Sequence, residues 1–205
     1  MWPYWIMLLA FDTSTAACTA ALFDGSGACI ARRDELIGRG HAERLVPMLD
    51  ELLAGRRPDT IIVGVGPGSF TGIRVAIAAA HGLAIGWNAE ILGMSSLALL
   101  AAQAGGAVAV AVSGGHGELF VQEYRASGEP AGDLLNLPPA AAAAAVSADL
   151  VVGSGAAALA AARGRGEARD LLPSAADALK LPPALRSLPA RPVYARAPDA
   201  KAKAA

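Results

Sequence analysis

The chain has 205 residues, which is enough for one domain or two small lobes with a real core. Its formal net charge of -1 excludes a strong whole-protein field for binding nucleic acid independently. Hydrophobic residues make up 54% of the chain, but alanine inflates this share. The apolar N-terminal run ends at Asp12, well before the roughly 20 residues that a membrane span needs. No later run is expected to span a membrane, and residues 1–6 are expected to be an extension.

The first hundred residues predict an α/β unit. Apolar runs between turn residues indicate three strands, a helix, a strand, a helix, a short strand and a helix. Their expected ranges are 7–13, 18–24, 28–34, 42–53, 61–65, 70–85, 91–92 and 95–103. A hairpin turn at Gly25-Ser26 would pair Leu22 with Cys29 and keep Cys18 roughly 13 Å from Cys29. Two unpaired thiols predict a reduced, cytoplasmic protein.

The second half predicts a smaller unit that begins after a seam at Gly105-Gly106. It is expected to contain paired strands, an alanine-rich helix opened by two prolines, a short strand and another helix. The expected ranges are 107–112, 119–125, 138–147, 150–152 and a helix after residue 155. Residues 171–189 predict one short helix, and residues 197–205 predict a disordered tail.

Residues 60–84 are the most informative stretch. A β-branched run enters Gly64-Val65-Gly66-Pro67-Gly68, which forces a tight turn into a helix. Ser69 or Thr71 is positioned to cap that helix, so Gly66, Gly68, Ser69 and Thr71 form the expected capping turn. Backbone N–H groups at such a turn can hold an anion or accept a close-packed partner. The glycine spacing fits neither a Walker loop nor a Rossmann fingerprint.

The string Gly66-Pro67-Gly68-Ser69-Phe70-Thr71-Gly72-Ile73-Arg74 resembles the signature of the TsaB (YeaZ) family. Members of that family are non-catalytic partners of TsaD in bacterial threonylcarbamoyladenosine synthesis on tRNA. The string at 41–49 and the closing Pro192-Val193-Tyr194-Ala195-Arg196 are also similar to the family, so the resemblance covers residues 7–196. It is strong over the first hundred residues and patchy later. Together with the element order, it implies an α/β, ribonuclease H-like fold of the actin, Hsp70 and sugar-kinase superfamily, with lobes at 7–105 and 106–196.

Two helices are candidates for a partner surface. In the first, apolar residues recur at helical spacing, and this pattern alone supports an ordinary core-facing helix. The resemblance implies instead that the helices at 42–53 and 70–85 together build an interface with a partner subunit. The expected interface residues are Leu45, Val46, Met48, Leu49, Leu52, Phe70, Ile73 and Ile77. His41 and Glu43, at the start of the first helix, are interpreted as surface or capping residues.

The loop Asp12-Thr13-Ser14-Thr15 follows the first strand, where ATP-binding relatives hold metal and phosphate. Alone it indicates an Asx turn. With the resemblance, the string indicates a degenerate phosphate loop. Thr15 and the alanines after it crowd the space that a phosphate would occupy. TsaD carries two metal-binding histidines, and Met94 and Ala98 occupy their positions here. No metal site, catalytic residue or intrinsic cofactor is therefore expected.

The resemblance implies a scaffold subunit, not an enzyme by itself, that pairs with a TsaD-like catalytic subunit. A TsaE-like ATPase, ATP or ADP, and tRNA are expected only through that complex, and no membrane is expected. One alternative is a small ATP-using kinase or carbamoyltransferase, in which Asp12, Thr13 and the turn at Gly66 and Gly68 would grip phosphate. The other alternative is a self-associating homodimer that uses the same helices.

Overall fold

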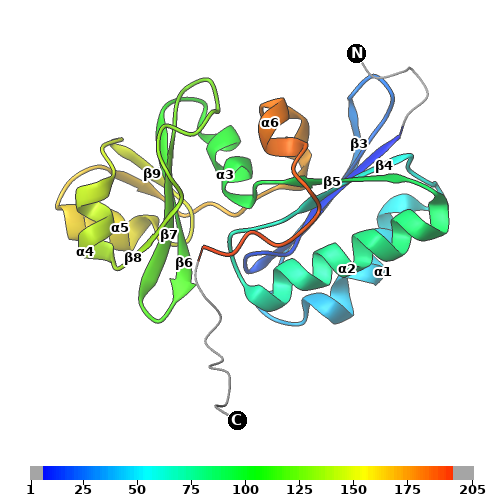
Figure 1. Cartoon of the computed structure of the whole chain (residues 1–205), viewed down its shortest axis with the longest axis horizontal. Helices are drawn as coiled ribbons and strands as arrows, with labels where there is room; N and C mark the ends of the chain where they lie inside the picture. The colour runs from blue at the N-terminus through cyan, green and yellow to red at the C-terminus, as the bar shows by residue number, and fades with distance from the viewer. Residues whose placement is uncertain (1–6, 196–205) are drawn as a thin grey trace, which may run out of the picture.

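The computed structural model describes residues 7–195, which form two lobes, each around a five-stranded sheet (Figure 1). The expected extension at 1–6 and tail at 197–205 lie outside the described residues. In chain order the elements are β1 (Leu8–Asp12), β2 (Ala17–Phe23), β3 (Cys29–Leu36), α1 (His41–Leu53), β4 (Thr60–Gly64), α2 (Phe70–Trp87), β5 (Glu90–Met94), α3 (Ser96–Ala104), β6 (Val108–Gly115), β7 (Glu118–Tyr124), β8 (Leu135–Leu137), α4 (Pro139–Ala145), β9 (Leu150–Val152), α5 (Ala156–Arg163), β10 (Glu167–Arg169), the 3-10 helix η1 (Ala175–Lys180) and α6 (Pro183–Arg186).

Both sheets have the same topology. Their strand orders are β3-β2-β1-β4-β5 and β8-β7-β6-β9-β10. In each sheet the central strand, β1 or β6, pairs antiparallel with the next strand and parallel with β4 or β9. Helices α4 and α5 of the second lobe thus occupy the topological places of α1 and α2. This repeated arrangement confirms the predicted ribonuclease H-like fold with two lobes.

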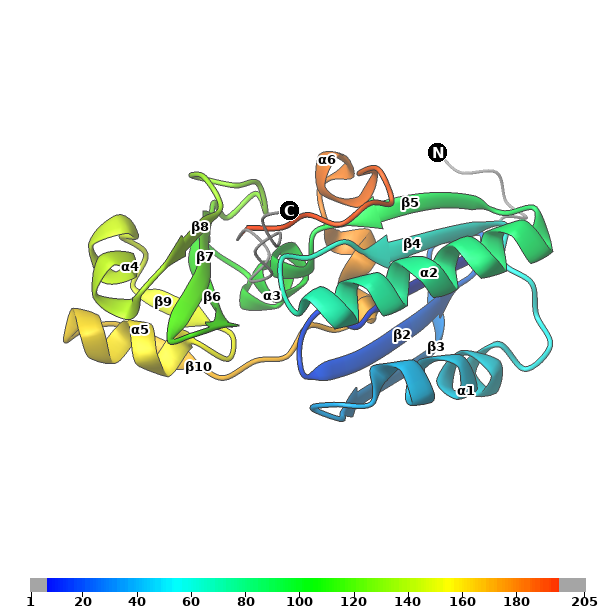
Figure 2. The same cartoon turned by 60° about the horizontal axis from the view of Figure 1, so that its bottom comes forward.

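The helices and sheets are stacked in layers (Figures 1 and 2). Strand β1 alternates between two cores: Leu9 and Phe11 pack with α1 and α2, whereas Leu8 and Ala10 pack with α3 and η1. The second core also contains Val108 and other residues of the second sheet, so α3 and η1 lie between the two sheets. Helices α4 and α5 cover the far side of the second sheet. The shared central core holds the lobes together.

Ser95 caps α3 as predicted, because its hydroxyl oxygen accepts a hydrogen bond from the Ala98 N–H at 3.3 Å. The expected hairpin register is wrong by two residues: Leu22 pairs with Ala31, and Cys18 pairs with Glu35. The cause is a longer turn built by the Asp24 carboxylate. That carboxylate accepts hydrogen bonds from two backbone N–H groups of the turn, at 2.9 and 3.1 Å.

Other sequence expectations also need correction. Strands β8 and β10 were not predicted, because each has only three residues and no buried apolar run. Their pairing with β7 and β9 creates them. The segment 171–189 contains two short helices, η1 and α6, instead of one. The two cysteines are free, with Cys18 buried and Cys29 exposed.

Helix α2 meets the criteria of length and apolarity for a membrane span, although no later run was expected to be both long and bulky enough. Within residues 7–195 it is the one helix with sufficient length and apolarity, at 18 residues and a mean hydropathy of 1.3. However, one side of α2 packs on the first sheet through Ile73 and Ala76, and Arg74 and His81 lie on its exposed side. A helix that covers a sheet meets the same criteria of length and composition, so this is weak evidence for a span.

Candidate partner surface and interlobe cleft

The turn between β4 and α2 packs directly against the loop after β1. The Thr13 hydroxyl donates a hydrogen bond to the Gly72 carbonyl at 2.7 Å. A Cβ atom on Gly72 would lie 1.9 Å from the Thr13 carbonyl oxygen, and one on Gly68 would lie 2.1 Å from the Ser14 carbonyl oxygen. These glycines are therefore required because two backbone segments touch. The close-packed partner expected from the sequence is this loop of the same chain.

The capping turn has the polar contacts that its sequence predicts. Ser69 is the N-cap of α2, and its hydroxyl oxygen accepts from the Gly72 N–H at 3.3 Å. The Ser69 N–H itself donates to the Ser14 carbonyl at 2.7 Å. Thr71 lies inside the helix, on its exposed side. Gly66 has a φ of +101°, a conformation that favours glycine, and its N–H donates to the Ser96 hydroxyl oxygen at 3.2 Å.

Asp12 is fully buried, and both of its carboxylate oxygens are bonded inside the protein. One oxygen accepts from the Ser14 N–H and the Ser14 hydroxyl, each at 2.7 Å, and the other accepts from the Ser96 hydroxyl. A Cβ atom on Gly64, at the end of the neighbouring strand β4, would lie 1.8 Å from this carboxylate. The missing side chain of Gly64 therefore leaves the space that the Asp12 carboxylate fills. Asp12 therefore ties the loop to α3 and does not face the cleft.

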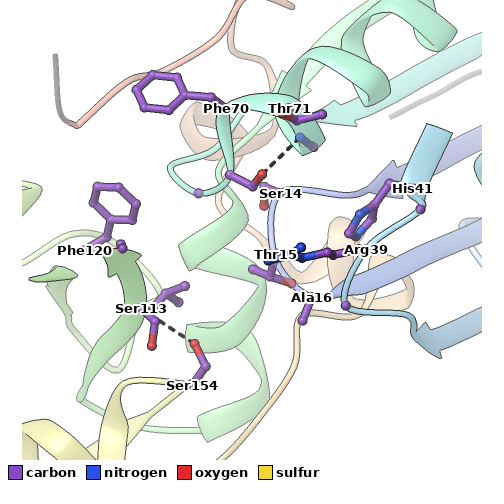
Figure 3. A pocket seen from close by; sticks show the side chains of 18 of the residues that line it. Ser14, Thr15, Ala16, Arg39, His41, Phe70, Thr71, Ser113, Phe120 and Ser154 are labelled. Carbon is purple, nitrogen blue, oxygen red and sulfur yellow. Dashed lines mark hydrogen bonds between the residues drawn. The ribbon is translucent and has the colours of Figure 1, made fainter. Parts of the chain in front are cut away.

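A cleft of about 890 Å³ opens between the lobes (Figure 3). Its lining combines the loop at 14–16, the segment at 38–43 and the capping turn with residues from the second lobe. Figure 3 shows Thr15 and Arg39 of the first lobe on one side of the cleft and Ser113 and Phe120 of the second lobe on the other, with Phe70 at the start of α2. Asp12 and Thr13 do not line it. Of the predicted phosphate-loop residues, only Ser14 and Thr15 reach this space.

Metal ligands are not gathered in the part of the chain that the structure describes, since no group of three or more His, Cys, Asp or Glu side chains is close enough to hold an ion. Met94 and Ala98, at the positions matched to the TsaD histidines, are buried in the central core. His41 is also buried, and its Nε2 lies 3.2 Å from the Ala17 carbonyl oxygen. The interpretation of His41 as a surface or capping residue is therefore wrong, since Gly40 is the N-cap of α1 and no side chain caps it, whereas Glu43 is exposed.

The apolar stripe that was expected to bind a partner lies in the core of the first lobe. Six of the eight expected interface residues are at most 8% exposed: Leu45, Met48, Leu49, Leu52, Ile73 and Ile77. They pack with Leu9 and Phe11 of β1. The sheet uses this stripe because its own apolar face must be covered. Of the predicted set, Val46 is exposed and Phe70 is partly exposed, so the stripe itself is not surface for a partner.

A different set of residues faces outward on α1 and α2, which lie side by side on the first sheet (Figure 2). Val46 is 61% exposed and Ile85 is 85% exposed. Small residues recur every four positions on the exposed side of α2, so they share one side of the helix. We call Val46, Ala78, Gly82, Ile85 and Gly86 the partner face. Spacing of small residues at every fourth position is the sequence signal that could have identified it.

A charged network joins α1 to the edge strand β3. The Arg44 guanidinium donates to both carboxylate oxygens of Glu35, at 2.6 and 2.7 Å, and to Glu51 at 2.9 Å. Hydrogen bonds from Arg44 are the largest cause that lowers the pKa of both glutamates below the ordinary value. These carboxylates are therefore more readily ionised in the folded protein than in the unfolded chain.

We expect the stabilisation from this network to be lost in acid. Because the folded-state pKa values are lowered, the contribution is present above the ordinary glutamate pKa, about 4.3, and disappears as pH falls through the folded-state values. Arg44→Gln should lower the melting temperature at neutral pH, and the difference from wild type should shrink at about pH 3. Melting curves from about pH 7 to about pH 3 measure this. A difference in melting temperature that does not change with pH would contradict this expectation. The control is Arg165→Gln, in the second lobe.

The fold and the site define a class: a two-lobed, ribonuclease H-like protein whose strand-end aspartate is bonded internally. A family model described as "TsaD: tRNA N6-adenosine threonylcarbamoyltransferase" matches residues 34–169. In two Pseudomonas aeruginosa crystal structures, one protein is described as similar to the peptidase YeaZ and the other is YeaZ itself. Their TM-scores are 0.79 and 0.77, and their identities are 35% and 32%. The similarity covers 93% and 92% of this chain, and 100% and 99% of those chains.

Curated relatives agree with these structures. The "tRNA threonylcarbamoyladenosine biosynthesis protein TsaB" of Haemophilus influenzae is 42% identical over 102 residues, which cover 47% of this chain and 42% of that protein. The Escherichia coli protein of the same name is 36% identical over 129 residues, 58% of this chain and 54% of that protein. The chain spans about half the length of these curated relatives. It belongs to the TsaB (YeaZ) family.

Proposed function

We propose that this chain is a non-catalytic scaffold subunit that pairs with a TsaD-like protein. The pair would transfer a threonylcarbamoyl group to N6 of the tRNA adenosine next to the anticodon. Relatives named for threonylcarbamoyladenosine biosynthesis support the pathway. The partner face on α1 and α2 carries the scaffold role, because Ile85, 85% exposed, shares the exposed side of α2 with glycines that let another backbone approach closely, and Val46 is exposed on α1. Gly82 and Gly86 have no atom within 4 Å of an added Cβ.

The internal bonding of Asp12 also supports a non-catalytic role. To hold metal or phosphate in the cleft, this carboxylate would have to give up its bonds to Ser14 and Ser96. The alternative of a small ATP-using enzyme would use the cleft between the lobes. ATP or ADP, tRNA and a TsaE-like ATPase enter this proposal only through the complex with the TsaD-like subunit. ATP turnover by the isolated chain that Asp12→Ala abolishes would favour the enzyme instead.

Charge on the partner face is expected to break the complex without unfolding the chain. Ala78→Glu and Ile85→Glu replace exposed side chains, so the melting temperature should stay close to that of wild type. At position 85 a carboxylate buried against a partner helix without a counter-charge should weaken affinity at least about tenfold. At position 78 the loss should be smaller, because Arg74 lies one turn earlier and can pair with the new carboxylate. Titration calorimetry with the TsaD-like protein of the same organism measures this.

The matched control is Ala161→Glu, the same substitution on the exposed side of α5, the topological equivalent of α2 in the second lobe. It should bind like wild type. Light scattering of the isolated chain tests the homodimer alternative, and dissociation of a dimer by Ile85→Glu would assign the same face to self-association. Wild-type affinity in both the Ala78→Glu and Ile85→Glu variants would place the interface elsewhere.

A further inference from the structure

The end of the described chain is anchored across the first lobe. Gly93 at β5 and Leu188 exchange backbone hydrogen bonds of 2.6 and 2.9 Å, and the Val193 N–H donates to the Val65 carbonyl at 2.8 Å. A Cβ atom on Gly93 would lie 2.8 Å from the Pro189 carbonyl oxygen, so this contact is close. Figure 2 shows the segment, coloured red, running from α6 past the ends of β5 and β4 toward the start of α2.

This anchoring places Tyr194 against the first turn of α2. The ring centroids of Tyr194 and Phe70 are 4.8 Å apart. The Arg74 Nε–H donates to the Tyr194 hydroxyl oxygen at 2.9 Å. The carbon at the centre of its guanidinium lies 5.9 Å from the Phe70 centroid and 5.6 Å from that of Tyr194. The two aromatic rings therefore fix the orientation of an exposed arginine side chain.

The remaining edge of this guanidinium has no partner within the described residues 7–195. Nη1 and Nη2 of Arg74 form no hydrogen bond with any residue of the described range 7–195. A planar guanidinium with two free N–H groups binds a carboxylate through two parallel hydrogen bonds. Because one edge is already held by Tyr194, little side-chain freedom remains to be lost on binding.

The surroundings favour a protein carboxylate over an RNA phosphate. Arg74 lies one turn before Ala78 on the exposed side of α2, so it continues the partner face. Helix α2 has no other Lys or Arg, so its exposed side lacks the cluster of basic side chains that binds a phosphate backbone. A protein helix along α2 would instead bring one acidic side chain to Arg74 and apolar side chains to Ala78 and beyond.

We propose that Arg74 binds an Asp or Glu side chain of the partner protein, with Tyr194 and Phe70 as positioning residues. This rests on the proposed function, since the partner is the TsaD-like subunit. Arg74 would supply orientation at one end of the interface, because two parallel hydrogen bonds fix the direction of the partner carboxylate. The apolar partner face would supply most of the buried area.

Affinity for the TsaD-like protein is measured by titration calorimetry at two salt concentrations. Arg74→Gln should weaken binding about tenfold, since a hydrogen-bonded charge pair is lost. Arg74→Lys should restore little of the lost affinity, because an ammonium group cannot form two parallel hydrogen bonds with a carboxylate. Tyr194→Phe should weaken binding a few-fold. The double variant Arg74→Gln/Tyr194→Phe should be no weaker than Arg74→Gln, because Tyr194 acts through Arg74. Arg165→Gln is the control, and melting curves verify folding.

The outcomes separate this inference from the proposed function. If Ile85→Glu weakens binding but the Arg74 and Tyr194 variants bind like wild type, the carboxylate contact is overturned and the scaffold role stands. If Arg74→Gln instead weakens only tRNA binding by the isolated chain, the ligand is a phosphate and the proposal is wrong. If the wild-type chain does not bind the TsaD-like protein at all, both proposals are overturned.

Discussion

Leu45→Glu is expected to unfold this protein and not merely release a partner. Leu45 is 0% exposed and packs in the core between α1 and the first sheet. The substitution loses about 1.5–3 kcal/mol of apolar burial, and the buried carboxylate adds a larger desolvation cost. The sum approaches the whole free energy of unfolding of a typical domain, about 5–15 kcal/mol. Leu49→Glu should behave in the same way, because Leu49 is only 2% exposed.

Circular dichroism melting and size-exclusion chromatography measure this effect. The matched control is Val46→Glu, one residue along the same helix, where the side chain is 61% exposed. It should melt within a few degrees of wild type and should act only on partner binding. A Leu45→Glu protein that melts like wild type would show that Leu45 of α1 does not pack against the first sheet. The apolar stripe of α1 is therefore treated as core, whereas the family resemblance implied that it binds a partner.

Gly72→Ala and Gly82→Ala are expected to shift stability in opposite directions, although both change glycine to alanine in α2. At position 72 the new methyl group would lie 1.9 Å from the Thr13 carbonyl oxygen, so one backbone segment must move. Overpacking of this kind costs about 1–3 kcal/mol or more, and displacing the loop also strains the Thr13 hydrogen bond. At position 82 nothing lies within 4 Å, and removing an interior helical glycine stabilises by about 0.5–1 kcal/mol.

Chemical denaturation of both variants gives the two free energies of unfolding. Gly82→Ala should also keep most of the partner affinity, because a methyl group is still small. Equal effects at the two positions would mean that α2 does not pack on the loop after β1. The pair thus tests whether Gly72, in the family signature, serves backbone packing, whereas Gly82, further along the helix, lies on an open surface.

The local sequence predicted the first lobe well. Ser69 and Ser95 cap the helices expected after them, because a hydroxyl one residue before an apolar periodic run satisfies free N–H groups. Strand pairing was less predictable. The Asp24 side chain closes a longer turn than Gly25-Ser26 alone would define, and this moves the register by two residues. Register depends on which side-chain contacts close the loop, and residue propensities do not contain that information.

The candidate site was predicted only in part. The family strings pointed to α1 and α2, whose exposed residues form the proposed partner face, but the residues chosen on these helices were mostly core residues. Contacts between distant segments were also beyond the sequence. Tyr194 and Arg74 are 120 residues apart along the chain, and only the path of the last segment across β4 and β5 brings them together.

The sequence by itself determined the order of elements in the first lobe, the family, and the places where backbone turns require glycine. These follow from local chemistry: apolar spacing, capping hydroxyls and the steric freedom of glycine. Only the tertiary structure decided which side of α1 and α2 faces solvent and where the Asp12 carboxylate points. Helical spacing shows that a helix has an apolar side, but whether a sheet of the same chain or another protein covers that side depends on how the whole chain packs.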